Sequence, residues 1–148
     1  MSQPYESADL ILKLYDLRRE PKMREARQWF IGFTPDTVDD LFATLQGPNS
    51  ANFRMVATYW DMAASLVLNG AIDEQMFNDA NGEHIAIFAK VEHLVGAYRE
   101  KTGLTHYLQN LEQLILRMPN AKERLTATRE RLRALAAARA QAAAAATK

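Results

Sequence analysis

The stretch ANFRMVATYWDMAASLVLN, residues 51–69, carries the longest apolar helical pattern of the chain and decides the fold. Apolar side chains occupy most of its circumference, and its polar residues fall on one narrow stripe. A helix that is apolar on several sides is buried by several neighbours. Gly47-Pro48 before it and Gly70 after it mark its ends. We therefore expect this helix to lie at the centre of a helical bundle.

Proline, glycine and capping residues divide the rest of the chain into further helices. Ser7 is expected to cap the first helix, Pro21 to begin the second, and Asp73 to cap a short one. No segment alternates apolar and polar residues with period two, so no strand is expected. The sequence predicts an all-α, single-domain bundle of six to seven helices over residues 1–120, followed by an alanine- and arginine-rich C-terminal helix or partly disordered tail over residues 121–148. The expected helices of the bundle span residues 8–19, 21–33, 36–46, 51–69, 74–80, 83–102 and 104–118.

The composition excludes several classes of protein. The 148 residues contain no cysteine, which excludes disulfides and thiolate metal sites and fits a reducing compartment. The longest strongly apolar run, residues 62–68, is far shorter than the about 20 residues that a membrane-spanning helix needs. The first ten residues have neither the basic region nor the cleavage site of a signal peptide. We expect a cytoplasmic protein without a membrane span.

The zero net charge of the chain conceals two oppositely charged parts. Residues 121–148 carry seven basic and two acidic side chains, a net of +5, and residues 1–120 therefore carry a net of −5. The tail either packs back on the acidic body, or pairs with a protein partner or its own copy, or forms a weak nucleic-acid surface. The candidate contact residues of the tail are Arg124, Leu125, Arg129, Leu132 and Leu135.

A dense run of charges spans residues 18–27, RREPKMREAR. Arg24 and Arg27 lie one helical turn apart near an expected helix N-terminus, where the helix dipole disfavours cations. Acidic side chains of the fold, such as Asp16, Glu20 or Asp61, provide one form of compensation, and a bound anion provides another. Arg24 and Arg27 are therefore candidates for anion binding, and the neighbouring Arg18 and Arg19 are candidates for contacts with a partner.

Asp61 is a carboxylate in the most apolar helix, directly after Tyr59 and Trp60. A buried aspartate is either paired or protonated. The sequence leaves two alternatives open: a structural pair with an arginine such as Arg54, Arg24 or Arg27, or a general base in a pocket lined by Tyr59 and Trp60.

Patterns of catalytic and metal-binding residues are missing from the sequence. His84 and His93 are nine residues apart and point to opposite sides of one helix, and His106 lies on another segment. No phosphate-binding glycine loop, nucleophile motif or calcium loop occurs. We predict no metal site, no cofactor and no catalytic residue.

Three segments carry a resemblance to a known family: LYDLRREPKMREARQWF, VATYWDMAASLVLNGAIDEQMF and YREKTG. Over residues 5–118 the chain resembles an uncharacterised bacterial family of small all-helical proteins, a domain of unknown function. The resemblance implies a helical bundle of bacterial origin and supplies no functional residues.

These observations favour a non-catalytic helical module for protein interaction or self-association. The alternatives are a protein that binds a small anionic ligand, or an enzyme, with a pocket around Arg24, Arg27 and Asp61, and weak nucleic-acid binding through the basic tail.

Overall fold

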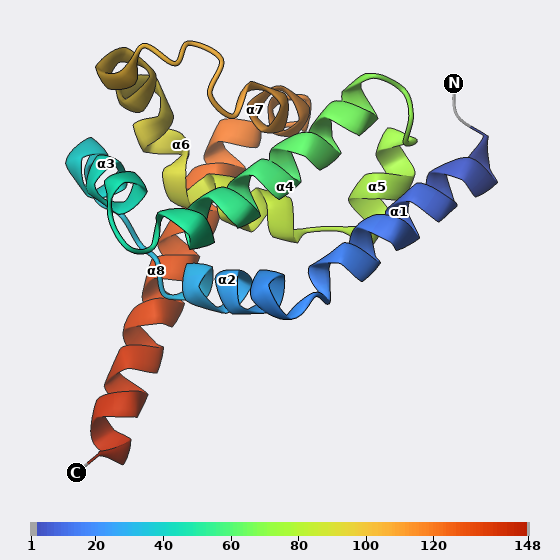
Figure 1. The fold of residues 1–148 in the computed structure, drawn as a ribbon. Coiled ribbons are helices and arrows are strands. Elements are labelled where there is room, and N and C mark those ends of the chain that lie inside the picture. Colours follow the sequence, from blue (N-terminus) through green and yellow to red (C-terminus); the bar gives the residue numbers. More distant parts are fainter. Residues whose placement is uncertain (1–2, 148) are drawn as a thin grey trace.

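The computed structural model describes residues 3–147, which form eight helices and no strand (Figure 1). The helices are α1 (Pro4–Arg18), α2 (Pro21–Ile31), α3 (Val38–Gln46), α4 (Ser50–Leu68), α5 (Glu74–Ala80), α6 (Glu83–Thr102), α7 (Gln109–Leu116) and α8 (Ala121–Ala146). The prediction of an all-α fold is confirmed. The structure has eight helices, whereas a bundle of six to seven was predicted. Seven helices form the body, and α8 is the eighth member of the bundle because its fully buried Leu125 joins the same core.

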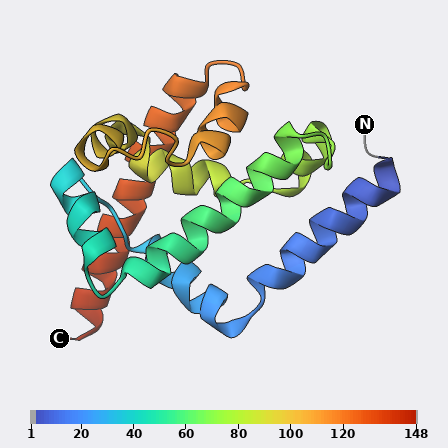
Figure 2. The ribbon, with the colours of Figure 1, turned by 45° about the horizontal axis from the view of Figure 1, so that its top comes forward.

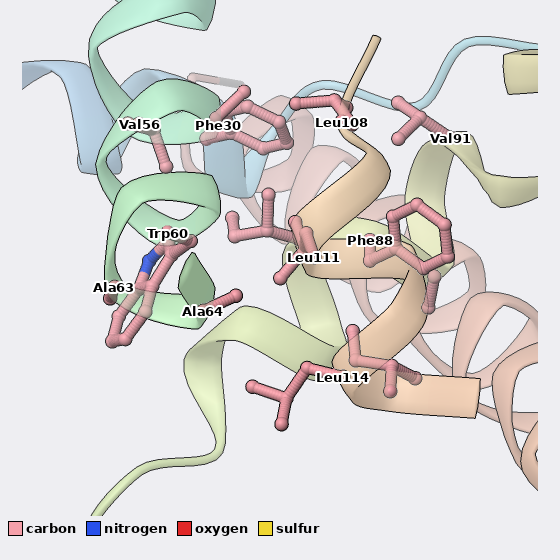
Figure 3. Packing of buried hydrophobic residues seen from close by; sticks show 14 of the residues in the cluster. Phe30, Val56, Trp60, Ala63, Ala64, Phe88, Val91, Leu108, Leu111 and Leu114 are labelled. Carbon is pink, nitrogen blue, oxygen red and sulfur yellow. The ribbon is translucent and has the colours of Figure 1, made fainter. Parts of the chain in front are cut away.

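Helix α4 is the central element of the bundle. It packs against α2, α3, α5, α6 and α7. Its buried side chains are Phe53, Val56, Ala57, Trp60, Ala63, Ala64 and Val67. The three alanines let neighbouring helices approach closely, and Figure 3 shows Ala64 and Trp60 of α4 near Leu111 and Leu114 of α7. The core is therefore built around the segment with the longest apolar pattern.

Local capping sets several helix boundaries. Glu20 and Asp73 accept hydrogen bonds from the third backbone N–H of α2 and α5, and Thr37 forms a capping box with Asp40 at the start of α3. Gly103 ends α6 in the left-handed conformation, at φ 77°.

The expected role of Ser7 as a helix cap is wrong. Helix α1 begins at Pro4, one turn earlier, because proline is compatible with a first helical turn. Ser7 is fully buried inside α1, and its hydroxyl accepts a hydrogen bond from the backbone N–H of Asp73 (2.9 Å). It thus joins α1 to the start of α5.

Helix α7 is shorter than the predicted residues 104–118. The chain turns through residues 105–108 before the helix begins at Gln109. Leu108, the residue at the N-cap position, has φ 54°, and its apolar side chain offers no acceptor to the helix N-terminus. The free N–H groups of α7 therefore need an acceptor from elsewhere in the fold.

Helices α1 and α8 are the outermost elements. Figure 1 and Figure 2 show α1 along one edge and α8 running past the body on the other side, with its C-terminal end projecting. The first half of α8 packs on α6, whereas residues 137–147 are exposed. None of the helices formed by residues 3–147 combines the length and the apolar character that crossing a membrane requires.

Candidate functional site

The elbow between α1 and α2 brings arginines of two helices together. Helix α1 ends at Arg18, and α2 begins at Pro21 with the Glu20 carboxylate bound to the Met23 N–H (2.9 Å). This short connection turns the chain sharply (Figure 2). As a result, the basic residues at the end of α1 and in the first turns of α2 share one side of the elbow.

Four of these arginines line one surface hollow of about 390 Å³, which we call the arginine hollow. Its lining consists of Tyr15, Arg18, Arg19, Arg24 and Arg27. The structure thus brings together two residues predicted for anion binding, Arg24 and Arg27, and two predicted for partner contact, Arg18 and Arg19. The hollow is open to solvent on the surface of the α1–α2 elbow.

Glu83, the first residue of α6, pairs with two of the four arginines. Its carboxylate accepts hydrogen bonds from Nε (2.9 Å) and Nη2 (2.8 Å) of Arg27 and from Nη1 of Arg18 (3.2 Å). The hydrogen bond with Glu83 raises the pKa of Arg27. The helix dipole favours a carboxylate at this position. The acidic partner is therefore Glu83, and not Asp16, Glu20 or Asp61 as the sequence suggested.

Arg19 and Arg24 differ from Arg18 and Arg27, because their guanidinium groups pair with no carboxylate of the described residues. Both are exposed, and neither forms an ion pair with any of residues 3–147. The arginine hollow therefore contains four guanidinium groups, of which two, on Arg18 and Arg27, pair with a carboxylate among residues 3–147. Such a site favours an anionic group, because guanidinium groups bind carboxylates and phosphates in a bidentate manner.

Tyr59 and Trp60 lie behind the hollow and do not line it. The Tyr59 hydroxyl donates a hydrogen bond to the Leu14 carbonyl oxygen of α1, and burial raises the pKa of Tyr59 to about 12. Trp60 is fully buried, and the Arg18 guanidinium lies 5.3 Å from the centroid of its ring. The two aromatic residues hold α1 and Arg18 in place.

Asp61 takes no part in the arginine hollow, which corrects the predicted pocket around Arg24, Arg27 and Asp61. One carboxylate oxygen of Asp61 accepts a hydrogen bond from the Leu111 N–H (2.9 Å), and the other accepts one from the Asn110 side chain (3.2 Å). Asp61 thus supplies the acceptor that the N-terminus of α7 lacks. Its role is structural, with backbone and amide partners rather than an arginine.

The candidate residues of the tail have separate environments. Leu125 is fully buried in the core of its own chain and is closed to a partner. Arg129 binds Glu92 (3.3 Å) and the Ala89 carbonyl oxygen (3.3 Å), while Arg124 is exposed. Leu132 and Leu135 line a second hollow between α2, α6 and α8. The tail therefore packs back on the acidic body over its first half.

An exposed apolar stripe on α1 leads to the arginine hollow, and the sequence analysis did not find it. Tyr5, Leu12 and Tyr15 are 72%, 66% and 52% exposed. Their spacing places them on one face of the helix, which continues to Arg19. The spacing is visible in the sequence, but only the packing shows that this face of α1 has no covering helix. Tyr15 belongs to both the stripe and the arginine hollow.

Among residues 3–147, no three histidine, aspartate or glutamate side chains lie close enough together to hold a metal ion. His84 is buried between the rings of Trp60 and Phe77, at 5.6 Å and 5.0 Å between ring centroids.

The fold defines an all-helical bundle protein with basic hollows at its surface. The family model described as "Domain of unknown function (DUF4760)" matches residues 5–118, and the chain belongs to this family. The match confirms the resemblance to a domain of unknown function, and it ends before α8. Comparisons with curated proteins and with solved structures give no match.

Proposed function

We propose that this protein is a non-catalytic interaction module that binds an acidic, amphipathic helical segment of another protein along α1 and in the arginine hollow. The observation that carries the proposal is the excess of charge in the hollow, where four arginines line the surface and only two of them, Arg18 and Arg27, pair with a carboxylate of the described residues. We further propose that it works in the bacterial cytoplasm, since the family resemblance implies a bacterial origin and the sequence leads us to expect a cytoplasmic protein.

The apolar stripe supports a helical partner rather than a small ion. Three large side chains, Tyr5, Leu12 and Tyr15, lie exposed along about three turns of α1. Tyrosine is enriched at protein interfaces because it combines apolar area with a polar end. An amphipathic helix that lies along α1 covers this stripe and brings its acidic end to the hollow.

The charge distribution favours this surface over the basic tail. Arg129 and Arg133 of α8 pair with Glu92 and Asp36 of the body. Two arginines of the tail are therefore paired within their own chain, which leaves less positive charge for binding nucleic acid. Arg19 and Arg24 have no such partner in the part of the chain that the structure describes.

Fluorescence anisotropy with two labelled peptides tests the proposal. One peptide is an amphipathic helix with a glutamate-rich end, and the other carries lysine in place of each glutamate. We expect the wild-type protein to bind the acidic peptide, with an affinity that falls as salt rises, and not the lysine peptide. The double variant Arg19→Glu/Arg24→Glu should bind the acidic peptide about tenfold more weakly or worse.

A matched control separates the hollow from net charge. The double variant Arg124→Glu/Arg131→Glu makes the same charge change at exposed positions of α8 and should bind like wild type. Equal losses in both double variants, or no loss in either, would disprove the proposal. Light scattering provides a further test. If the wild type forms a stable dimer that Tyr15→Glu dissociates, the stripe binds a second copy of the chain and the proposal is wrong.

A further inference from the structure

A second hollow, which we call the α8 slot, lies between α2, α6 and α8 and has a volume of about 310 Å³. Its apolar lining comes from all three helices and consists of Phe30, Ile31, Ala86, Ile87, Leu132 and Leu135. The volume lies at the lower end of the roughly 300–1,000 Å³ range of small-molecule sites. The slot is thus a small-ligand site in size, and it shares Arg27 with the arginine hollow proposed above for a protein partner.

Lys90 places a buried positive charge in the α8 slot. The side chain is on α6, and the residue is only 7% exposed. Its ammonium donates hydrogen bonds to the carbonyl oxygens of Phe30 (2.6 Å) and Ile31 (3.0 Å) at the end of α2. An ammonium has three N–H donors, so one remains for a further acceptor. A buried ammonium without a carboxylate is costly, and an anion in the slot would offset that cost.

Arg139 of α8 adds a second cation to the lining. Within residues 3–147, neither Lys90 nor Arg139 forms an ion pair with a carboxylate. The remaining charged residues of the lining, Arg27 and Glu83, bind each other at 2.8 Å. The slot therefore has two cations without a carboxylate partner in the described part of the chain, and an apolar interior. Burial, and to a smaller extent the charge of Arg139, lowers the pKa of Lys90 to about 8.

The wall formed by α8 is fixed to the body next to the slot. Arg129 binds Glu92, and Arg133 donates a hydrogen bond to the Pro35 carbonyl oxygen (2.9 Å) and pairs with Asp36. These contacts precede Leu135 and Arg139 along the helix. The wall lies outside the segment that matches the family model, so the slot combines the family domain with the tail of this chain.

We infer that the α8 slot binds a small amphiphilic carboxylate, with its carboxylate on Lys90 and Arg139 and its aliphatic body between Leu132, Leu135 and Ile87. Two cations select the charged group, because a carboxylate accepts hydrogen bonds from both an ammonium and a guanidinium. The apolar lining selects a hydrocarbon body, since its burial contributes about 0.8 kcal/mol per CH₂ group. Acetate lacks the aliphatic body and octanol lacks the carboxylate, so acetate can contact only the cations of the slot and octanol only its apolar lining.

Isothermal titration calorimetry with octanoate, octanol and acetate tests this inference on the full chain. We expect octanoate to bind the wild type at millimolar concentration or below, and octanol and acetate to bind at least about tenfold more weakly. Arg139→Gln removes an exposed charge and should weaken octanoate binding by about fivefold or more. Leu132→Trp fills the slot and should abolish binding.

Two further variants test whether these effects arise in the slot itself. Arg131→Gln, an exposed change on α8 outside the slot, should bind octanoate like wild type. If Leu132→Trp does not fold by circular dichroism, Leu135→Trp replaces it, because Leu135 is 47% exposed and tolerates a larger side chain. No octanoate binding by the wild type, equal binding of octanol, or unchanged binding in Arg139→Gln or in the tryptophan variant would overturn the inference. The outcome is independent of the peptide experiment, which uses Arg19 and Arg24.

Discussion

Asp61 of α4 caps α7, whose residue Leu111 donates its backbone N–H to the Asp61 carboxylate at 2.9 Å. The two residues are 50 positions apart in the sequence. Most helices are capped by the residue just before them, but Leu108 at that place has an apolar side chain and a left-handed backbone. The acidic residue that resembled a catalytic group therefore stabilises a helix N-terminus instead.

Asp61→Ala should destabilise the fold without affecting the arginine hollow. Removing a capping acceptor costs about 1–2 kcal/mol, and we expect that decrease in the free energy of unfolding by urea denaturation. Asp79→Ala, an exposed aspartate on α5, should change stability by less than about 0.5 kcal/mol. If Asp61→Ala is as stable as wild type but loses binding of the acidic peptide, the structural role of Asp61 is wrong.

Glu83→Gln should lower stability and strengthen peptide binding at the same time. The variant loses the ion pairs with Arg18 and Arg27, and hydrogen bonds to charged groups contribute about 1.5–3 kcal/mol each when well formed. Partial exposure of these side chains reduces the expected loss to about 2 kcal/mol. The two arginines are then free for the acidic peptide, so we expect its affinity to rise several-fold.

The matched variant for this prediction is Glu25→Gln, an exposed change on α2 with the same loss of charge. It should leave stability within about 0.5 kcal/mol of wild type. An unchanged or reduced peptide affinity in Glu83→Gln would mean that Arg18 and Arg27 do not contribute to binding.

The sequence predicted those features that depend on neighbours along the chain. Helix positions follow from apolar spacing and capping residues, and Arg18, Arg19, Arg24 and Arg27 meet because one short connection separates them. The pairing of Arg27 with Glu83, across 56 residues, needs the three-dimensional arrangement of α2 and α6.

Burial was the second kind of information that the sequence lacked. Lys90 lies among apolar residues of α6, but the sequence does not show that α2 ends beside it and accepts its hydrogen bonds. The exposed face of α1 is a further case, because the spacing of Tyr5, Leu12 and Tyr15 is equally compatible with a buried stripe.

His84 should make stability depend on pH. Burial lowers its pKa to about 4, whereas an unfolded histidine titrates near 6.5. The folded protein therefore keeps His84 neutral, and the unfolded chain takes up a proton as the pH falls below about 6.5. The contribution of His84 is fully present above that pH and is lost progressively between about pH 6.5 and 4, by roughly 3 kcal/mol in total.

Urea denaturation across this pH range, for wild type and His84→Phe, measures the contribution of His84. Neither ring nitrogen of His84 has a hydrogen-bond partner among the described residues, so phenylalanine fits the apolar site without leaving a polar partner unpaired. We expect the difference in stability between the two proteins to change in favour of the variant as the pH falls. Burial also lowers the pKa of His93, but His93 contributes equally to both proteins and cancels. A difference that is constant between pH 7 and 4 would contradict a buried neutral His84.

Shortening α8 separates its role in the core from a role at its exposed end. A chain that ends at Arg139 loses residues 140–148, of which the described ones, 140–147, are exposed, and it should unfold within about 0.5 kcal/mol of wild type. A chain that ends at Asn120 loses the buried Leu125 and the ion pairs of Arg129 and Arg133. Loss of a buried leucine alone costs about 2–5 kcal/mol, so this shorter chain should be strongly destabilised in thermal unfolding.

The chain that ends at Asn120 also exposes apolar core surface and should self-associate for that reason, which makes its oligomeric state uninformative about partners. The chain ending at Arg139 is the informative one. If its subunit count in native mass spectrometry differs from that of the full chain, residues 140–148 form a contact between copies, and an unchanged count means that they form none.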